Sequence, residues 1–324
     1  MQTIDKLVTN LPFEERHRAL LEQAAPEANI VYVDPRDKEG LAAELRDATV
    51  AVILSKPDVS AAKKLKWMHW DAAGLDAIAQ DDYIRAGFAI TGSAGRSAPA
   101  LAEHVLYFML NHAYRQRAVL AAQDAHRWGY EGQQETQALF SRTIGIVGLG
   151  HTGRALARRA KALEMRVLAY TRSIAESADV DRLYSPNRSE RLEDMLPECD
   201  YLVLCCALTD QTYHMLGREQ LALMKPTAMV INVGRGKTVD EAALLDALRG
   251  GRLAGAGLDT FETEPLPADS PIWDMQNLMV TPHFTPPCPD KLGRSLEIVL
   301  ENIRRFHAEE PLLNQLKPED KFTA

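Results

Sequence analysis

The sequence has few of the features that mark a secreted, metal-binding or membrane protein. Its 324 residues include four cysteines, at positions 199, 205, 206 and 288. They form no Cys-x-x-Cys pair, so neither a zinc site nor a disulfide framework is expected. No run of about 18 apolar residues occurs, and the N-terminal segment MQTIDKLVTNLPFEERHRAL has no signal-peptide region. The formal net charge is -8, whereas a nucleic-acid partner would require a basic face. We therefore expect a soluble cytoplasmic protein with no metal, membrane or nucleic-acid partner.

The length and the spacing of the apolar runs predict two α/β domains. A chain of 324 residues is longer than a typical single domain. Segments with helical character, such as Glu14–Ala24 and Leu41–Arg46, separate most of the runs, and this alternation is typical of parallel sheets. The first five runs are Ile4–Thr9, Asn29–Val33, Val50–Leu54, Leu65–Trp70 and Gly87–Thr91. About six more are expected to form a second sheet: Thr143–Gly148, Arg166–Tyr170, Tyr201–Cys205, Met229–Val233, Ala254–Asp259 and Leu278–Thr281.

Residues 143–153, TIGIVGLGHTG, predict a dinucleotide site near the middle of the chain. A short apolar run leads into the glycines and then into a helical stretch. Gly148 permits the tight turn, Gly150 permits close approach of a pyrophosphate, and Gly153 permits close packing of helix and strand. The N–H groups at the start of the helix then face the phosphates. The central position of the motif implies that another domain precedes the cofactor domain.

We expect the cofactor domain to be inserted into the first one. Small residues from Thr91 to Pro99 mark the join, and Ala100–Ala113 follows as a strongly apolar helix that should be buried. A further helix, Leu296–Phe306, returns the chain to the first domain. The predicted fold is α/β, with a Rossmann-type doubly wound parallel sheet (residues 99–289) inserted into a flavodoxin-like substrate domain (residues 1–98 and 290–324).

Three residues of the types needed to reduce a keto acid follow strands of the second sheet. Arg235 lies in VINVGRGKTVDEAAL, Glu264 in GAGLDTFETEPLP and His283 in LMVTPHF. An arginine binds carboxylates through two parallel bonds. A histidine can protonate the carbonyl oxygen, and a neighbouring carboxylate favours its charged form. Ligands of open parallel sheets bind beyond the carboxyl ends of the strands, so these residues are the predicted catalytic group.

Other polar residues nearby have simpler explanations. Glu262 is expected to be a surface charge, while His69 and His104 are expected to be packing or interior hydrogen-bonding residues. Cys205 and Cys206 lie in an apolar run and are most simply core residues.

Four motifs in order, GIVGLGHTG, NVGRGKTVDEAAL, GAGLDTFETEPLP and TPH, resemble those of the D-isomer-specific 2-hydroxyacid dehydrogenase family over nearly the whole chain. The resemblance implies that Arg235 binds substrate, that His283 is the acid/base and that Glu264 is its partner. Asp259 is implied to contact the nicotinamide carboxamide. The family also implies a homodimer built around residues 100–113, and a substrate that lies between the domains.

In the first domain, LKWMHWDAAGLDAI resembles the family loop whose backbone N–H groups bind the substrate carboxylate. The matching positions are Ala73 and Gly74, and Ala72 stands where the family often has a second glycine. Trp70 could wall the pocket or belong to the core. The segment Leu54-Ser55-Lys56 is a weaker candidate for the same pocket.

The end of the second nucleotide-domain strand favours NADP over NAD. An NAD-specific enzyme usually has a carboxylate there, whereas this chain has Thr171 and Arg172, and an arginine pairs with a 2′-phosphate. The alternative is that Arg172 points to solvent and that the enzyme takes either cofactor, so NAD stays possible. Ala207 replaces a family proline beside the adenine. The predicted cofactor contacts are Gly148, Gly150, His151, Thr152, Gly153, Thr171, Arg172, Ser173, Cys206, Ala207, Val233, Gly234 and Asp259.

These observations favour a reductase that converts small 2-keto acids to D-2-hydroxy acids. The chain ends soon after Asn314 without the regulatory extension of many phosphoglycerate dehydrogenases, which favours a glyoxylate or hydroxypyruvate reductase type. Phe284 and the proline-rich segment after it depart from the family and leave a bulkier or aromatic acid open. A second hypothesis is a dinucleotide-sensing corepressor-like binding protein, since fold does not imply function.

Overall fold

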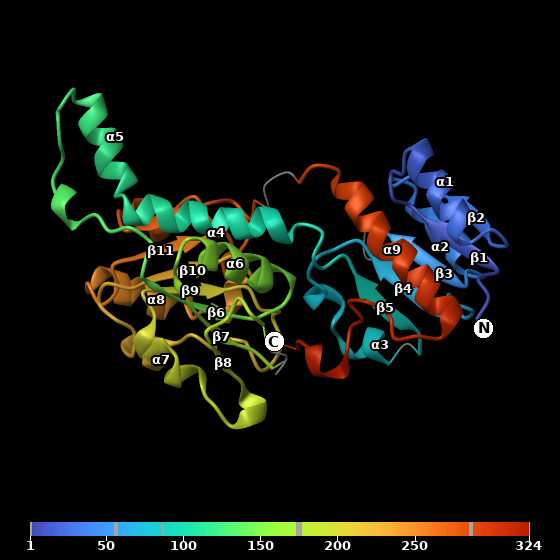
Figure 1. Ribbon diagram of the computed structural model, residues 1–324. Helices are drawn as coiled ribbons and strands as arrows, with labels where there is room; N and C mark the ends of the chain where they lie inside the picture. Colours follow the sequence, from blue (N-terminus) through green and yellow to red (C-terminus); the bar gives the residue numbers. More distant parts are fainter. Residues whose placement is uncertain (1, 55–57, 86, 173–176, 285–287, 324) are drawn as a thin grey trace. The chain divides into compact units, whose positions relative to one another are not determined.

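A computed structural model describes residues 2–54, 58–85, 87–172, 177–284 and 288–323 (Figure 1). The chain divides into two compact units. Unit 1 comprises Met1–Ser97 and Pro287–Ala324, and unit 2 comprises Ala98–Pro286. The sequence predicted that the chain passes between the two domains after residues 98 and 289. The observed boundaries between the units lie one and three residues earlier. None of the described helices is long and apolar enough to span a lipid bilayer.

Unit 1 contains a five-stranded parallel sheet in the order β2-β1-β3-β4-β5. All five strands coincide with predicted apolar runs, so this part of the fold prediction is confirmed. The strands are β1 (Lys6–Thr9), β2 (Asn29–Tyr32), β3 (Val50–Ile53), β4 (Trp67–Trp70) and β5 (Ala89–Gly92).

Helices cover both faces of this sheet. Leu21 of α1 (Glu15–Ala24) and Leu296, Val299 and Ile303 of α9 (Lys291–Ala308) share one buried cluster with β1, β3 and β4. Figure 1 shows α1 and α9 together on that face. The opposite face packs against α2 (Lys38–Leu45) and the segment that includes α3 (Asp81–Ile84). The return of α9 to unit 1 confirms the predicted insertion of one domain into the other.

Unit 2 contains a seven-stranded parallel sheet in the order β12-β11-β10-β9-β6-β7-β8. Six strands were predicted and β8 was not, because it has three residues at the sheet edge with a charged first position. The strands are β6 (Thr143–Val147), β7 (Arg166–Tyr170), β8 (Arg182–Tyr184), β9 (Tyr201–Leu204), β10 (Met229–Asn232), β11 (Gly255–Leu258) and β12 (Leu278–Val280).

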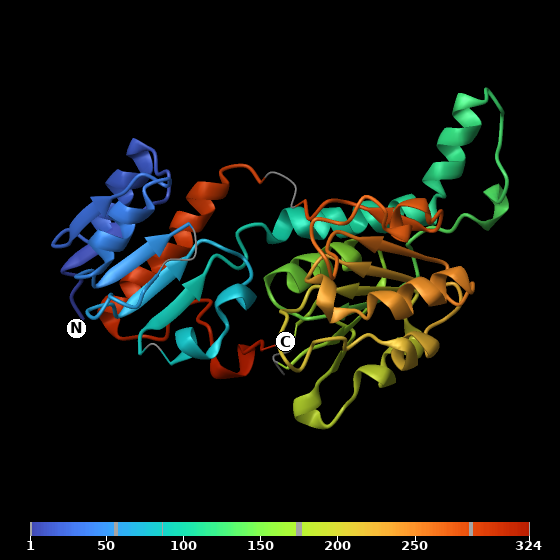
Figure 2. The ribbon, with the colours of Figure 1, turned by 180° about the vertical axis from the view of Figure 1, so that it is seen from behind.

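The helices of unit 2 form a layer on each face of the sheet. On one face, α4 (Ala98–Ala113) and α6 (His151–Ala162) pack together over β6, β7, β9 and β10. On the other face lie α7 (Arg218–Ala222) and α8 (Glu241–Arg249), which are seen best from behind (Figure 2). The sequence predicted a buried α4, but this is only half correct: Phe108 is fully buried while Tyr107 and Leu110 are exposed.

Beyond α4 the chain forms an arm that projects from the sheet of unit 2 (Figure 1). The arm contains α5 (Gln116–Asp124) and a 3-10 turn at Gln133–Glu135. In α5, Ala122 is the one described buried residue, so this helix contributes little to the core. We call residues 114–140 the arm.

Candidate active site

Three glycines shape the end of β6 as the dinucleotide motif requires. Gly148 has φ +96°, and a Cβ there would lie 2.8 Å from the Cys206 backbone. A Cβ on Gly153 would lie 2.1 Å from the Gly148 carbonyl oxygen, so only glycine lets α6 approach the turn. A Cβ on Gly150 would meet nothing within 4 Å, so the backbone there is open to a ligand.

The first turn of α6 presents backbone donors at this opening. The first hydrogen bond of the helix runs from Arg154 N–H to the Gly150 oxygen (3.0 Å). The N–H groups of His151, Thr152 and Gly153 therefore precede the helical ladder, and the positive end of the helix dipole lies with them. This donor set fits a pyrophosphate.

The neighbouring strand ends supply the other predicted cofactor residues. Val233 pairs with Leu204 across β10 and β9 (3.1 Å), and Gly234 lies so close to β9 that a Cβ would be 3.0 Å from the Cys206 oxygen. Ala207, expected beside the adenine, is exposed, and its carbonyl oxygen accepts a 2.7 Å bond from Thr212. Cys206 is half-buried rather than fully in the core, as is Cys205.

Thr171 and Arg172 lie where the sequence predicted, directly after β7. Thr171 N–H donates to the Tyr184 oxygen of β8 (3.0 Å), and Asn187 Nδ2 holds the Arg172 carbonyl at 2.7 Å. The Arg172 side chain is exposed. Burial raises the pKa of the Cys206 thiol to about 11, and the Arg172 charge opposes that rise. Ser173 lies outside the described residues.

The catalytic candidates follow three neighbouring strands, because β10, β11 and β12 are adjacent in the sheet. His283 and Glu264 are in contact: Nδ1 of the histidine lies 2.6 Å from Oε2 of the glutamate. The other carboxylate oxygen, Oε1, accepts the Phe261 N–H at 2.9 Å, which fixes the carboxylate. Since a carboxylate only accepts, Nδ1 donates this bond and carries a proton.

Arg235 lies in the turn after β10. Its carbonyl oxygen accepts bonds from Asn232 Nδ2 (3.0 Å) and from the Thr238 hydroxyl (2.7 Å). Its Nη1 donates to the Gly234 oxygen at 2.9 Å. Two buried polar side chains therefore hold the backbone from which the guanidinium extends.

Asp259 supports the turn that carries His283, a role that sequence reasoning did not identify. It lies buried at the end of β11, and its Oδ1 accepts bonds from the Thr281 hydroxyl (2.6 Å) and from Phe284 N–H (2.8 Å). His283, between these two partners, has φ +48°, in the left-handed region. The carboxylate offsets the strain of that conformation by fixing the turn on both sides.

Two of the other polar residues behave as expected and one does not. His104 stacks on Phe108 and contacts Thr281 Oγ1 (3.2 Å), and His69 is fully buried, so both are interior hydrogen-bonding residues. The prediction that Glu262 is a surface charge is wrong. It is half-buried, accepts the first N–H of α8 at 2.9 Å and pairs with His214 at 2.9 Å. Glu262 therefore has a structural role, because its carboxylate accepts a hydrogen bond at the N-terminus of α8.

In unit 1, Ala73 and Gly74 lie in the turn after β4. Ala73 is exposed and Gly74 half-buried, so this turn lies at the surface of unit 1. Trp70 is half-buried, and its Nε1 donates to the Leu54 oxygen at 3.2 Å. Ser55 and Lys56, the weaker candidates for this pocket, lie outside the described residues.

Comparisons with known proteins agree with this architecture. Residues 106–285, more than half of the chain, match the family model "D-isomer specific 2-hydroxyacid dehydrogenase, NAD binding domain". A glyoxylate reductase from Korarchaeum cryptofilum is 34% identical over 296 residues, which are 88% of this chain and 84% of that protein.

Solved structures show the same likeness. A D-isomer specific 2-hydroxyacid dehydrogenase from Xanthobacter autotrophicus, in complex with NADPH and MES, has a TM-score of 0.80 and 29% identity over 98% of this chain and 99% of its own. An NADPH-dependent glyoxylate/hydroxypyruvate reductase from Sinorhizobium meliloti, in complex with NADP and sulfate, has a TM-score of 0.80 and 28% identity over 97% and 98% of the two chains.

The fold and the glycine-rich turn together define a dehydrogenase that uses a nicotinamide dinucleotide. The family follows from the match: this chain belongs to the D-isomer specific 2-hydroxyacid dehydrogenases, which are NAD(P)-dependent oxidoreductases.

Proposed function

We propose that this enzyme reduces small 2-keto acids of the glyoxylate and hydroxypyruvate type to D-2-hydroxy acids. The observation that carries the proposal is the 2.6 Å contact between His283 Nδ1 and Glu264 Oε2, beyond the carboxyl ends of adjacent strands. Arg235 extends from the turn after the next strand of the same sheet. The glyoxylate reductases among the relatives support the choice of substrate class.

In the proposed reaction each of the three residues has one task. Arg235 binds the keto acid and polarises its carbonyl. A bound nicotinamide supplies the hydride to the carbonyl carbon. Nε2 of protonated His283 donates its proton to the carbonyl oxygen. Glu264 holds Nδ1 and stabilises the positive charge that the ring carries before this transfer. In the reverse direction the neutral ring takes the proton back.

We further propose that the turn after β4 binds the substrate carboxylate through the N–H groups of Ala73 and Gly74. Successive N–H groups in such a turn form a concave site for an anion. Asp259 is proposed to contact the nicotinamide carboxamide in addition to supporting the His283 turn.

A panel of keto acids tests this function directly. Glyoxylate, hydroxypyruvate and phenylpyruvate are each assayed with NADPH and with NADH, by the loss of reduced cofactor. We expect turnover of the two small acids. Preference for phenylpyruvate would instead support the bulkier-acid alternative, to which the exposed Phe284 side chain gives some basis. Tight cofactor binding with no turnover of any acid would favour the corepressor-like binding protein.

We propose NADP as the preferred cofactor, because Arg172 is an exposed cation at the end of β7 and a 2′-phosphate pairs with arginine. The two neighbours in complex with NADPH or NADP support this choice.

The variant Arg172→Ala should raise KM for NADPH by about 10- to 100-fold, the size of a lost charge-assisted bond. KM for NADH should change by less than about threefold, since that cofactor has no 2′-phosphate. Steady-state kinetics with both cofactors measures the two effects. Arg188→Ala, in the 3-10 turn that follows β8, is the matched control, and equal effects of Arg172→Ala on both cofactors would refute the assignment.

We propose that two copies of the chain form a homodimer through α4 and the arm. Tyr107 and Leu110 on one side of α4, Tyr114 just after it and Trp128 in the arm are large, exposed side chains. A groove of about 840 Å³ beside them is lined by α4, α5 and residues near β12. A second copy that fills this groove would bury the apolar surface of both chains.

Leu110→Glu should convert the dimer into a monomer of 36.0 kDa, because a charge would be desolvated in the apolar surface. Sedimentation equilibrium gives the mass. Leu20→Glu is the matched control: Leu20 is 46% exposed on α1 and Leu110 is 42% exposed on α4. A wild-type monomer, or a dimer that persists in Leu110→Glu, would contradict the proposed interface.

A further inference from the structure

A series of polar side chains crosses the sheet of unit 1 on the face covered by α9. His69 lies in β4 and Asp71 directly follows that strand. In the same way, Thr91 lies in β5 and Ser93 directly follows it. The register aligns His69 with Thr91, and side chains two residues apart share a face. All four are buried, where apolar side chains would normally lie.

These side chains form one continuous hydrogen-bonded row. Trp67 Nε1 donates to the Thr91 hydroxyl (2.8 Å), which lies 2.9 Å from His69 Nδ1. His69 Nε2 lies 2.9 Å from the Ser93 hydroxyl, which donates to Asp71 at 2.5 Å. The indole can only donate and the carboxylate can only accept, so each bond in the row points toward Asp71. In this arrangement His69 is neutral, with its proton on Nε2. Its burial favours the neutral form, because burial lowers the pKa of the ring to about 4.

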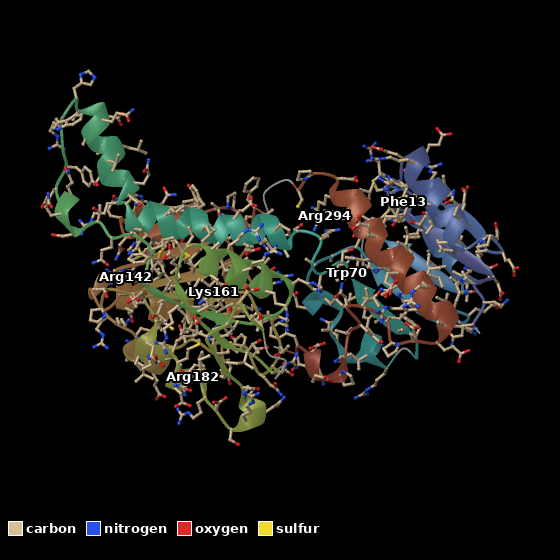
Figure 3. All side chains as sticks on the ribbon, viewed as in Figure 1. Phe13, Trp70, Arg142, Lys161, Arg182 and Arg294 are labelled. Carbon is tan, nitrogen blue, oxygen red and sulfur yellow. The ribbon has the colours of Figure 1, made fainter. Side chains whose placement is uncertain are left out.

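Arg96 closes the row at Asp71. The two side chains form an ion pair, with 11% and 6% of each exposed. Nη1 of Arg96 also donates to Ser295 Oγ (3.0 Å), and its carbonyl oxygen accepts a 2.7 Å bond from Nε of Arg294. Arg294, labelled in Figure 3, lies near the start of α9. Arg96 therefore links Asp71, at the end of β4, to the first turns of α9, which follows the inserted domain.

Asp71 begins the turn that holds the backbone donors. Its N–H donates to the Ile53 oxygen (2.8 Å), and the next carbonyl, of Ala72, accepts Ser93 N–H (2.8 Å). A Cβ on Gly92 would lie 2.9 Å from that carbonyl oxygen, so the turn is packed closely against β5. Ala73 and Gly74 follow directly.

We propose that Asp71 and Arg96 are positioning residues that fix the Ala73 and Gly74 N–H groups for the substrate carboxylate. This inference rests on the proposed function, which assigns those donors to the substrate. A buried ion pair adds little stability compared with apolar side chains of the same volume, so stability alone does not account for the pair. A role in fixing the turn does account for the ion pair, since a displacement of about 1 Å at a binding site can lower catalysis about 100-fold.

The test is Asp71→Asn in the full-length enzyme, which keeps the shape of the side chain but removes its charge. Two quantities are measured: the kinetics of glyoxylate reduction, and the Kd of oxalate, an unreactive carboxylate, for the enzyme with NADP⁺ bound. We expect KM and the oxalate Kd to rise together by about 10- to 100-fold. We expect kcat to change by less than about threefold, because binding in ground and transition states weakens alike, and the Kd of NADP⁺ to stay constant.

Ser93→Ala is the second variant, in case Asp71→Asn does not fold; it removes the serine's bond to Asp71 and should raise the same two quantities. The matched control is Asn302→Ala. Asn302 is fully buried in unit 1 and holds Leu313 through two hydrogen bonds, at 2.7 and 3.2 Å, so this variant loses stability without removing a hydrogen bond of Asp71 or Arg96. Unchanged KM and oxalate Kd in a folded variant of Asp71 or Ser93 would overturn the inference, as would an equal rise in Asn302→Ala. Failure of the proposed function would appear in the wild-type enzyme, as absence of both turnover and oxalate binding.

Discussion

Replacement of His283 by alanine should lower kcat for keto-acid reduction by about 1,000-fold or more, since a positioned general acid contributes about 10²- to 10⁴-fold. Nδ1 of the ring lies 2.6 Å from Glu264 Oε2, so the ring is already oriented and its loss removes a prepared acid. KM should change far less than kcat, because the proton moves only in the transition state. Single-turnover and steady-state kinetics at saturating cofactor measure both constants.

His214→Ala is the matched control for this variant. His214 is also paired with a glutamate, Nε2 lying 2.9 Å from Glu262 Oε1, but it belongs to the turn before α7 and not to the end of β12. Its replacement should leave kcat within about threefold of wild type. A His283→Ala enzyme with circular dichroism and kcat close to those of wild type would show that another group donates the proton.

The sequence predicted most of the sheet content because buried parallel strands are continuous apolar runs. It did not reveal β8, whose three residues Arg182–Tyr184 run from exposed through half-buried to buried and so show no strand periodicity. Nor did it reveal the arm, because α5 has only one buried residue among those described, Ala122.

The candidate site divides in the same way. Arg235, Glu264 and His283 could be proposed because each follows a recognisable strand, and the strand order places the three strand ends side by side. The supporting contacts depend on exact register and turn geometry. Asp259 bonds Phe284 N–H across 25 residues of sequence, and Asp71 meets Arg96 only because β4 and β5 pair as they do. An isolated aspartate after a strand carries no local signal for either role.

Glu262 shows why two glutamates in one segment cannot be told apart from composition. Glu262 is half-buried and Glu264 is exposed, and both lie in the same turn. One caps α8 and pairs with His214, whereas the other pairs with His283. The two glutamates differ because the tertiary fold places one beside the N-terminus of α8 and the other beside the end of β12.

Replacement of Arg235 by glutamine should lower kcat/KM for glyoxylate by about 100- to 1,000-fold, the effect expected when a two-bond, charge-assisted contact to a carboxylate is lost. Both constants should change, because the arginine binds the acid in the ground state and polarises its carbonyl in the transition state. Arg235→Lys should recover only part of the loss, since an ammonium keeps the charge but not the planar fork.

The matched control for Arg235 is Lys237→Gln, which removes the same charge two residues later in the same turn. If Arg235 acts by contact with the substrate, Lys237→Gln should keep kcat/KM within about threefold, whereas a general loss of positive potential would lower both variants alike. Steady-state kinetics at two ionic strengths separates these explanations, because long-range attraction weakens with salt and a direct contact weakens much less. Equal losses in Arg235→Gln and Lys237→Gln that shrink together at high salt would remove Arg235 from the proposed substrate site.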